Sequence, residues 1–599
     1  MPRPPSSLQA LVLLLLLACG LGLLVFRGRT PVTSPPPSPT PAPTPLSAAP
    51  PRPPGTLTFT KDIAPLIHRH CAECHRPDAP GPFSLLTYSD VHKRARQIAD
   101  VTRRRAMPPW LPEPGLVAYL NQRGLHPDQL GLLQQWVAEG AVEGHPADLP
   151  APPTWPGGWQ LGAPDLLLKM SEPYRLAADG PDLYRNFVIP TGLTNSHFVS
   201  AVAFQPGGRG VHHVRVLLDD SGQCRKLDAD EPGPGFGGWM PPARFPPGHF
   251  VTWTPGKSPT VAGDGLAWRL DAGADVVLQM HLQRSGKEEL IQPVIGFYFT
   301  TTPPTRAAFA LGLSSRLIDI PAGATAYAVR REFQLPVAVE VLRVMPHAHY
   351  LAKRLETFAL LPDGTRRELL RINDWDFNWQ DEYRLATPIT LPAGTFVRME
   401  YTFDNSATNP RNPNHPPKPV RYGPQSTDEM AEFWLQVVPA DSTALGRLAA
   451  AQRAQDTRET VAYFEQKLAA HPLDVNARVE LGKALGALGR TVDAKQQFAL
   501  ALQTQPDSPE ARYFLGLALL NERDFAGAKT HFEAALKARP TYARAEHGLA
   551  LIALEAGQFG AAEQHLRNAE RLNPHDPLPK LTRERLARER ARAGKPPVP

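Results

Sequence analysis

The stretch Gly-Val-His-His-Val-Arg at residues 210–215 places two adjacent histidines inside a run of β-branched residues. Valine is stiff at its first side-chain torsion and packs well on a pleated sheet, so the run predicts a strand over residues 211–218. Similar short alternating runs, separated by Gly/Pro turns, continue from about residue 164 to residue 439. Regular short strands are typical of sandwiches and barrels, and these roughly 275 residues suffice for two sandwiches.

Three later segments add residues of matching chemistry. Residues 275–283 contain one histidine in Leu-Gln-Met-His, residues 339–349 end in His-Ala-His, and residues 426–430 read Ser-Thr-Asp-Glu-Met. Alternate residues of a strand share a face, so the histidines of His-Ala-His are expected side by side. Three imidazoles, or two imidazoles with a soft thioether, suit a metal that cycles between Cu(II) and Cu(I). The sequence therefore predicts two copper sites, a first site of His212, His213 and His281 and a second site of His347, His349 and Met430.

The motifs, in this order, resemble the copper type II, ascorbate-dependent monooxygenases, the family that includes peptidylglycine α-hydroxylating monooxygenase and dopamine β-monooxygenase. The resemblance covers nearly half of the chain. It implies two all-β, jelly-roll-like domains at residues 160–303 and 304–440, each holding one copper. It also implies that the first site stores an electron and that the second site, with His347, His349 and Met430, activates O2.

Each motif has a simpler explanation when it stands alone. An adjacent pair such as His212 and His213 is more often a surface or hydrogen-bonded pair, and a lone His281 in an apolar strand is usually a core residue. His-x-His on a strand binds zinc as readily as copper. Met430 alone would be assigned to the core. The occurrence of all six in the family's order favours the metal interpretation.

The chain also departs from the resemblance. Vertebrate members are rich in disulfides, whereas this region contains only Cys224. Where the peptide-hydroxylating enzyme has Asn and Tyr after its thioether, this chain has Glu432 and Trp434. A negative Glu432 would repel a substrate carboxylate, which argues against a glycine-extended peptide as substrate. Trp375, Trp379 and Trp434 either line an aromatic pocket or pack in the core.

A second chemical motif, Cys71-Ala-Glu-Cys74-His75, stands nearer the N-terminus. The C-x-x-C-H pattern attaches c-type haem through two thioethers, with the histidine as proximal iron ligand. Met107, in a proline-rich turn after the expected helix 88–105, is the predicted distal ligand, with His92 and His126 as rivals. The region resembles a small, all-α bacterial cytochrome c over residues 56–150. The alternatives are a redox C-x-x-C, or a zinc site with ligands from His68, His70 or His92.

Prolines recur every 34 residues near the C-terminus, at positions 472, 506, 540 and 574. Small residues keep the same period at positions 494, 528 and 562. A period of 34 with a closing proline is the tetratricopeptide signature, so residues 442–599 are expected to form an all-α solenoid. Stacked repeats leave a concave surface that suits a protein partner, although the array also fits a rigid cap without one.

The rest of the chain bounds the function. A net charge of +6 and the lack of a long basic run with interleaved aromatics argue against nucleic-acid binding, and four cysteines are too few for a disulfide scaffold. Residues 11–26 are apolar and flanked by arginines, which predicts a signal peptide or signal anchor within residues 1–29, with a lipoprotein cleavage box as an alternative. Residues 30–55 resemble a Pro-rich linker. An exported, periplasmic and membrane-anchored protein is expected.

Together these features predict a multidomain oxidoreductase with two copper ions and one covalently bound c-type haem. It would insert one oxygen atom of O2 into a C–H bond of a small-molecule or peptide-like substrate. Electrons would come from an ascorbate-like reductant or, through the haem, from a periplasmic redox protein. The main alternative is a haem/copper redox-sensing or copper-handling binding protein with a repeat platform; an adaptor with decayed metal sites is disfavoured because all six ligands are present.

Overall fold

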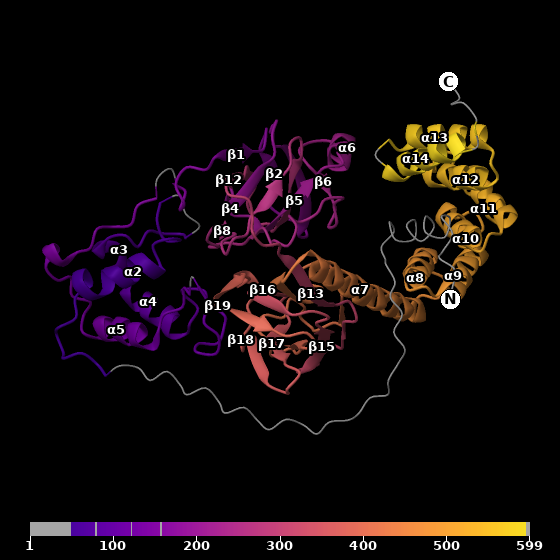
Figure 1. Cartoon of the computed structure of the whole chain (residues 1–599). Coiled ribbons are helices and arrows are strands. Elements are labelled where there is room, and N and C mark those ends of the chain that lie inside the picture. Colours follow the sequence, from indigo (N-terminus) through magenta and orange to yellow (C-terminus); the bar gives the residue numbers. More distant parts are fainter. Residues whose placement is uncertain are drawn as a thin grey trace. The chain divides into compact units, whose positions relative to one another are not determined.

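The computed structural model describes residues 50–77, 81–120, 122–155, 158–574, 576–592 and 594. The predicted signal segment and most of the linker lie outside these residues. The described residues divide into two compact units, which meet in sequence between Leu445 and Gly446. Figure 1 shows the order of their elements along the chain. Within the described ranges, no helix is both long enough and apolar enough to cross a membrane.

The first unit begins with a helical N-terminal module. Its elements are η1 (Phe59–Ile63), α2 (Ala64–His70), α3 (Tyr88–His92), α4 (Ala95–Arg103), α5 (Pro127–Ala138) and η2 (Pro146–Asp148). The apolar sides of these short helices meet in a core that includes Phe59, Ile67 and Trp136. The helix expected over residues 88–105 is interrupted between His92 and Ala95, so two short helices take its place.

A first β domain follows. One sheet has the order β1 (Leu166–Lys169), β12 (Val294–Thr300), β4 (His197–Gln205) and β8 (Thr260–Val261), with β9 (Trp268–Leu270) also pairing with β4. The other has the order β6 (Phe236–Gly237), β3 (Leu183–Pro190), β10 (Asp275–Leu282), β5 (Val211–Asp219) and β7 (Thr252–Trp253). A two-stranded sheet pairs β2 (Tyr174–Leu176) with β11 (Glu289–Ile291), and α6 spans Gln223–Asp230.

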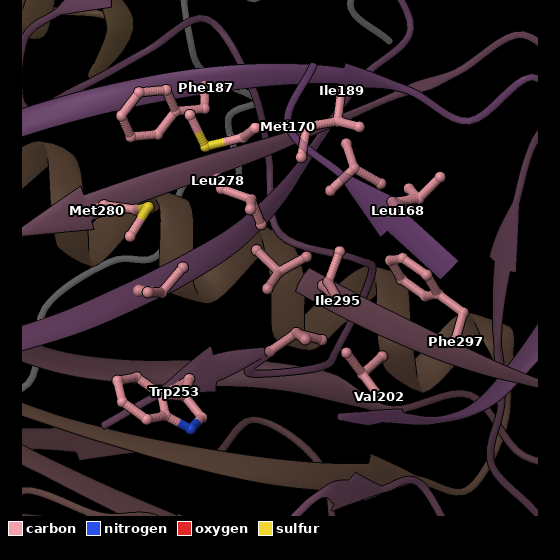
Figure 2. Close-up of a cluster of buried hydrophobic side chains, with 14 of the residues drawn as sticks. Leu168, Met170, Phe187, Ile189, Val202, Trp253, Leu278, Met280, Ile295 and Phe297 are labelled. Carbon is pink, nitrogen blue, oxygen red and sulfur yellow. The ribbon is translucent and has the colours of Figure 1, made fainter. Parts of the chain in front are cut away.

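The core of this domain lies between its two larger sheets. Phe187 and Met280 come from one sheet and Val202 and Phe297 from the other, and all four are buried in one cluster (Figure 2). Since alternate residues of β10 face opposite sides, Met280 enters this core while its neighbour His281 faces the opposite side of the sheet. The same alternation that builds the core therefore places the histidine on the outer face.

A second β domain has the same plan. Its first sheet has the order β13 (Phe309–Ser315), β22 (Ala431–Pro439), β16 (Val339–Ala348) and β19 (Tyr383–Leu391). Its second has the order β15 (Tyr327–Gln334), β20 (Phe396–Phe403), β17 (Ala352–Leu360) and β18 (Arg366–Ile372). The short β14 (Asp319–Ile320) pairs with β21 (Val420–Arg421). Residues 373–382, which include η4 (Phe377–Trp379), connect β18 to β19.

The C-terminal unit is built from antiparallel helix pairs. Its helices are α7 (Ser442–Ala470), α8 (Val475–Ala487), α9 (Thr491–Thr504), α10 (Pro509–Asn521), α11 (Phe525–Ala538), α12 (Ala543–Glu555), α13 (Phe559–Leu572) and α14 (Pro577–Arg592). A glycine in the first helix of a pair receives the phenylalanine of the second. A Cβ atom added to Gly482 would lie 2.4 Å from the Phe498 ring, and one added to Gly516 would lie 2.7 Å from the Phe532 ring. The 34-residue period thus reflects a repeated close contact.

Candidate metal centre

The first site lies on neighbouring strands of the first β domain. His281 on β10 is directly opposite His213 on β5, and His212 precedes His213 on the same strand. Their ring centroids are 4.8 Å apart for His213 and His281 and 5.1 Å apart for His212 and His281. Each ring offers a nitrogen within 4.8 Å of the others, and no other group of three or more His, Cys, Asp or Glu side chains in the described ranges gathers in this way.

The hydrogen bonds indicate which nitrogens of the first site are left for a metal. His281 Nε2 bonds to an Asp182 oxygen at 3.0 Å, while His281 Nδ1 is buried without a partner. The Nδ1 atoms of His212 and His213 lie 3.2 Å apart. Because a carboxylate on Nε2 fixes the proton there, it leaves the lone pair on Nδ1. The arrangement therefore favours coordination through Nδ1 atoms.

Asp182 connects the first site to the second β domain. It also accepts a hydrogen bond of 2.5 Å from Ser426 Oγ, in the segment that leads to Met430. Burial opposes ionisation of Asp182, but the bonds from His281 and Ser426 outweigh it and lower its pKa to about 2. The ring of Tyr184 stacks on His281 at 4.5 Å and covers its face. Asp182 thus remains an anion that orients His281 and ties the two domains together.

The second site lies where β16 ends and its antiparallel partner β22 begins. His347 is opposite Glu432 in this ladder, and Ala348 is opposite Ala431. His349 and Met430 follow as the next residues beyond the paired positions, and both are 1% exposed. The rings of His347 and His349 are 5.2 Å apart and nearly perpendicular. The structure therefore brings both histidines and the methionine to one end of the same strand pair.

Both histidines of the second site are held by Nδ1. His347 Nδ1 donates to Gln380 Oε1 at 2.5 Å, and His349 Nδ1 donates to the carbonyl of Asp428 at 3.1 Å. Each bond leaves Nε2 as the free nitrogen. The two sites thus use different ring atoms, Nδ1 in the first and Nε2 in the second.

A buried carboxylate fixes the backbone around these ligands. Glu429 accepts hydrogen bonds from the backbone N–H groups of His349 at 2.5 Å, Met430 at 2.8 Å and Leu351 at 3.0 Å. Burial raises the pKa of Glu429 to about 8, although these N–H groups act in the opposite direction. Glu429 therefore joins the end of β16 to the residue that precedes β22.

We name residues 375–382 the bridging loop, because it contacts both sites. Phe377 lies between them: its ring centroid is 4.5 Å from that of His212 and 5.2 Å from that of His349. Trp375 is wholly buried and donates from its indole nitrogen to the His349 carbonyl at 3.1 Å. Of the two roles considered for this tryptophan, the structure shows packing beneath the second site. One phenyl ring thus contacts a ligand of each set.

Burial sets the charge of these ligands. It lowers the pKa of His212 to about 3, with a further contribution from the nearby His281, and it lowers the pKa of His347 to about 4 and of His349 to about 3. At neutral pH these imidazoles are uncharged and have a lone pair for a metal. Glu432, bonded to the indole nitrogen of Trp434 at 3.2 Å, adds a negative group close to His349.

The Cys-x-x-Cys-His motif lies in the turn after α2. Cys71 and Cys74 form no disulfide, and burial raises the pKa of Cys71 to about 12. His75 Nδ1 donates to the Phe83 carbonyl at 3.1 Å, which leaves Nε2 for an axial bond. Of the motif's two cysteines and its histidine, only Cys74 lines a cavity of about 880 Å³ that reaches Trp253 in the first β domain. Free thiols, an oriented imidazole and adjacent space fit a covalently attached haem.

The other residues considered for the iron are less well placed. Met107 lies in the predicted turn and lines a separate cavity of about 40 Å³, whose walls include none of the motif's cysteines or its histidine. Among rival residues, His92 packs on Tyr88, and the backbone N–H of His126 bonds to Gln129 at the start of α5. The described residues contain no zinc-like group around the two cysteines.

Several supporting residues had no signal in the sequence. Asp182, Phe377, Gln380 and Glu429 belong to no spacing pattern, and their partners lie far away in the chain. Glu429 is the exception, because it lies inside the Ser-Thr-Asp-Glu-Met motif; the resemblance assigned a role to Met430 of this motif but none to Glu429.

Comparison with known proteins identifies the C-terminal unit. Tetratricopeptide-repeat family models match residues 445–509, 479–542 and 519–586. No curated protein matches. One similar solved structure is MamA, with 22% identity, coverage of 22% of this chain and 75% of that chain, and a TM-score of 0.19. Another is MamA from residue 41 to its end, from Desulfovibrio magneticus RS-1, with 24% identity, coverage of 23% of this chain and 76% of that chain, and a TM-score of 0.21. These TM-scores are low, and nothing further rests on them. The family models confirm the predicted repeats: residues 445–586 form a tetratricopeptide-repeat region.

Proposed function

We propose that this protein is an exported, copper-dependent monooxygenase that hydroxylates a C–H bond with O2. The observation that supports it best is the pair of buried ligand sets on either side of Phe377. The first offers three imidazoles, and the second offers two imidazoles with the thioether of Met430. Copper held in both sets would supply one-electron chemistry and O2 reduction, in which R–H, O2, two electrons and two protons give R–OH and water.

The chain's own residues would prepare this chemistry. Asp182 holds the proton of His281 on Nε2, and Gln380 accepts the proton of His347 Nδ1, so each ring presents its other nitrogen. Partners of this kind fix ligand orientation and raise ligand basicity. The buried Phe377 would exclude water where its ring contacts both sets. The negative Glu432 beside His349 disfavours a substrate carboxylate at the second site.

The N-terminal module would hold one c-type haem through Cys71 and Cys74, with His75 as axial ligand and Met107 as candidate distal ligand. This group would supply electrons from a periplasmic donor or an ascorbate-like reductant. The repeats would bind a protein partner, and the N-terminal segment would anchor the chain to the membrane. The substrate would be a small or peptide-like organic molecule.

The test is metal and haem content per chain, followed by oxygen uptake with candidate C–H substrates. The expected result is two copper ions and one haem, with Met430→Ile retaining the first copper and losing turnover. Preferential zinc binding would refute the proposal. The burial of four of the six ligands also suits a copper-handling or redox-sensing protein, and copper binding without substrate-coupled oxygen uptake would favour that function.

A further inference from the structure

The N-terminal module is joined to the second β domain by an isolated antiparallel β-bridge between Tyr119 and Leu385. β19 is the edge strand of its sheet. Ala386 N donates to the Ala118 carbonyl at 2.9 Å, and Leu120 N donates to the Arg384 carbonyl at 2.8 Å. Between them Tyr119 is 7% exposed, and its hydroxyl donates to the Leu369 carbonyl at 2.7 Å. This bridge and the tyrosine hydrogen bond tie the module's long loop, which also carries Met107, to the domain of the second site.

Arg123, at the end of this loop, extends the contact towards the bridging loop. Its guanidinium forms an ion pair with Asp381 and donates to the carbonyl of Gly256. The side chains of Arg123 and Asp381 are 19% and 12% exposed, so solvent screens the pair little. The Arg123 carbonyl also bonds to His70 Nδ1 at 3.0 Å, and His70 is the residue before Cys71. Arg123 therefore contacts both the haem-binding motif and the bridging loop.

Gln380 completes the connection. It precedes Asp381, and its side-chain oxygen accepts from His347 Nδ1 at 2.5 Å. Its carbonyl accepts from Thr254 Oγ1 at 2.7 Å, which fixes the peptide. A continuous series of bonds thus runs from His70 through Arg123, Asp381 and Gln380 to the ring of a second-site ligand.

We propose that electrons from the N-terminal module enter at the second site, with Arg123, Asp381 and Gln380 as the residues that connect the module to His347. This inference rests on the proposed function, which supplies the haem and copper. Haem held by Cys71, Cys74 and His75 would supply one electron at a time by oxidation from the ferrous to the ferric state, and copper held by His347, His349 and Met430 would accept it by reduction from Cu(II) to Cu(I), with no atom or proton moved. The first site would then receive its electron past Phe377.

A competing route leads to the first site directly. Trp253 on β7 pairs with Val214 on β5, the residue after His213. This route reaches His213 through its main chain, whereas the route through Gln380 ends on a nitrogen of the His347 ring. The hydrogen bond between Gln380 and the His347 ring is therefore the reason to prefer entry at the second site.

Single-site variants distinguish the two routes. The loaded protein would be reduced anaerobically at its haem, and the Cu(II) signal of each site would be followed by freeze-quench electron paramagnetic resonance. In His347→Ala, which removes the second site, the first-site Cu(II) should stay oxidised while the haem is reduced. In His213→Ala, the second-site Cu(II) should still be reduced promptly. Rapid reduction of the first site in His347→Ala would overturn the inference but leave the proposed function intact.

The connecting residues provide a second test. Gln380→Leu should slow reduction of the second site and weaken its copper affinity by about tenfold to a hundredfold, the usual effect of losing a ligand's hydrogen-bond partner. Gln380→Glu, which keeps an acceptor, should restore both. Arg123→Met should slow reduction, whereas Arg384→Met, which removes an ion pair with Asp264 in the same region, should not. Unchanged reduction in Gln380→Leu and Arg123→Met would refute the connection, and protein without haem or copper would overturn both proposals.

Discussion

Replacing Glu429 by glutamine should destabilise the second β domain and its ligand set together. The carboxylate receives three backbone N–H groups, those of His349, Leu351 and Met430, and all three bonds point towards its oxygens. An amide of the same shape keeps one acceptor oxygen but turns an NH2 group towards the donor of Leu351. The buried N–H of Leu351 then loses its acceptor, and the amide NH2 is buried beside it without an acceptor of its own.

The expected loss follows from these bonds. Leaving one buried donor without a partner costs about 1–3 kcal/mol, and burying a second donor without an acceptor adds a cost of similar size. Because the pKa of Glu429 is about 8, the native side chain is mostly neutral at pH 7, so the amide gains little from easier burial. We therefore expect Glu429→Gln to lower the free energy of unfolding by about 2–4 kcal/mol and to weaken copper binding at the second site.

The assay is urea denaturation of the metal-free protein, followed by copper titration. Glu432→Gln is the matched control, because this neighbouring carboxylate accepts a side-chain bond only from Trp434 among the interactions described, and it should lose about 1 kcal/mol. Equal stabilities for Glu429→Gln and the wild-type chain, with unchanged copper affinity at the second site, would show that Glu429 does not organise these ligands.

Phe377→Ala should lower the free energy of unfolding by about 3–5 kcal/mol through the cavity it leaves, and it should change the magnetic interaction between the two copper ions; an unchanged spectrum of the doubly loaded protein would contradict the bridging position. Asp182→Asn should weaken copper binding at the first site by about tenfold to a hundredfold and have a smaller effect on the second site, whose neighbouring Ser426 it also binds, as measured by competitive titration. In the repeats, burial lowers the pKa of His547 to about 4, from 6.5. Between these two pH values the unfolded chain binds a proton that the folded chain does not. The free energy of unfolding therefore falls by up to about 3 kcal/mol as the pH drops from about 6.5 to about 4. His547→Asn should remove this part of the pH dependence, as measured by denaturation followed through the helical signal.

The sequence predicted those parts of the fold whose residues recur at a regular spacing along the chain. The 34-residue repeat and the alternating strands are periodic, and the repeats and the central β-sheet domains are present as expected. The meeting of His212, His213 and His281 was expected from the family resemblance, because a local strand pattern does not reveal which strands pair; the structure places the two strands side by side.

The supporting residues depend on contacts between distant segments, which leave no local pattern. Asp182 acts through Ser426, 244 residues away, and Arg123 acts through Asp381, 258 residues away. The sequence around Phe377 does not distinguish it from an ordinary core phenylalanine; its role depends on the contacts of its ring with His212 and His349. The break between α3 and α4 was missed because composition alone does not reveal where a short helix ends.

The burial of the ligands has a consequence for how the protein acquires its metal. His281, His349 and Met430 are each 1% exposed, and Phe377 contacts a ligand of each set. His213 and His347 are partly exposed, so an ion arriving at the finished fold meets one reachable ligand of each set, and the remaining ligands become accessible only through a transient opening. Completion of each site in the folded protein should then be slow and independent of copper concentration, whereas uptake during refolding should be fast. The frequency with which the buried ligands open, rather than the supply of copper, would therefore set the rate of maturation.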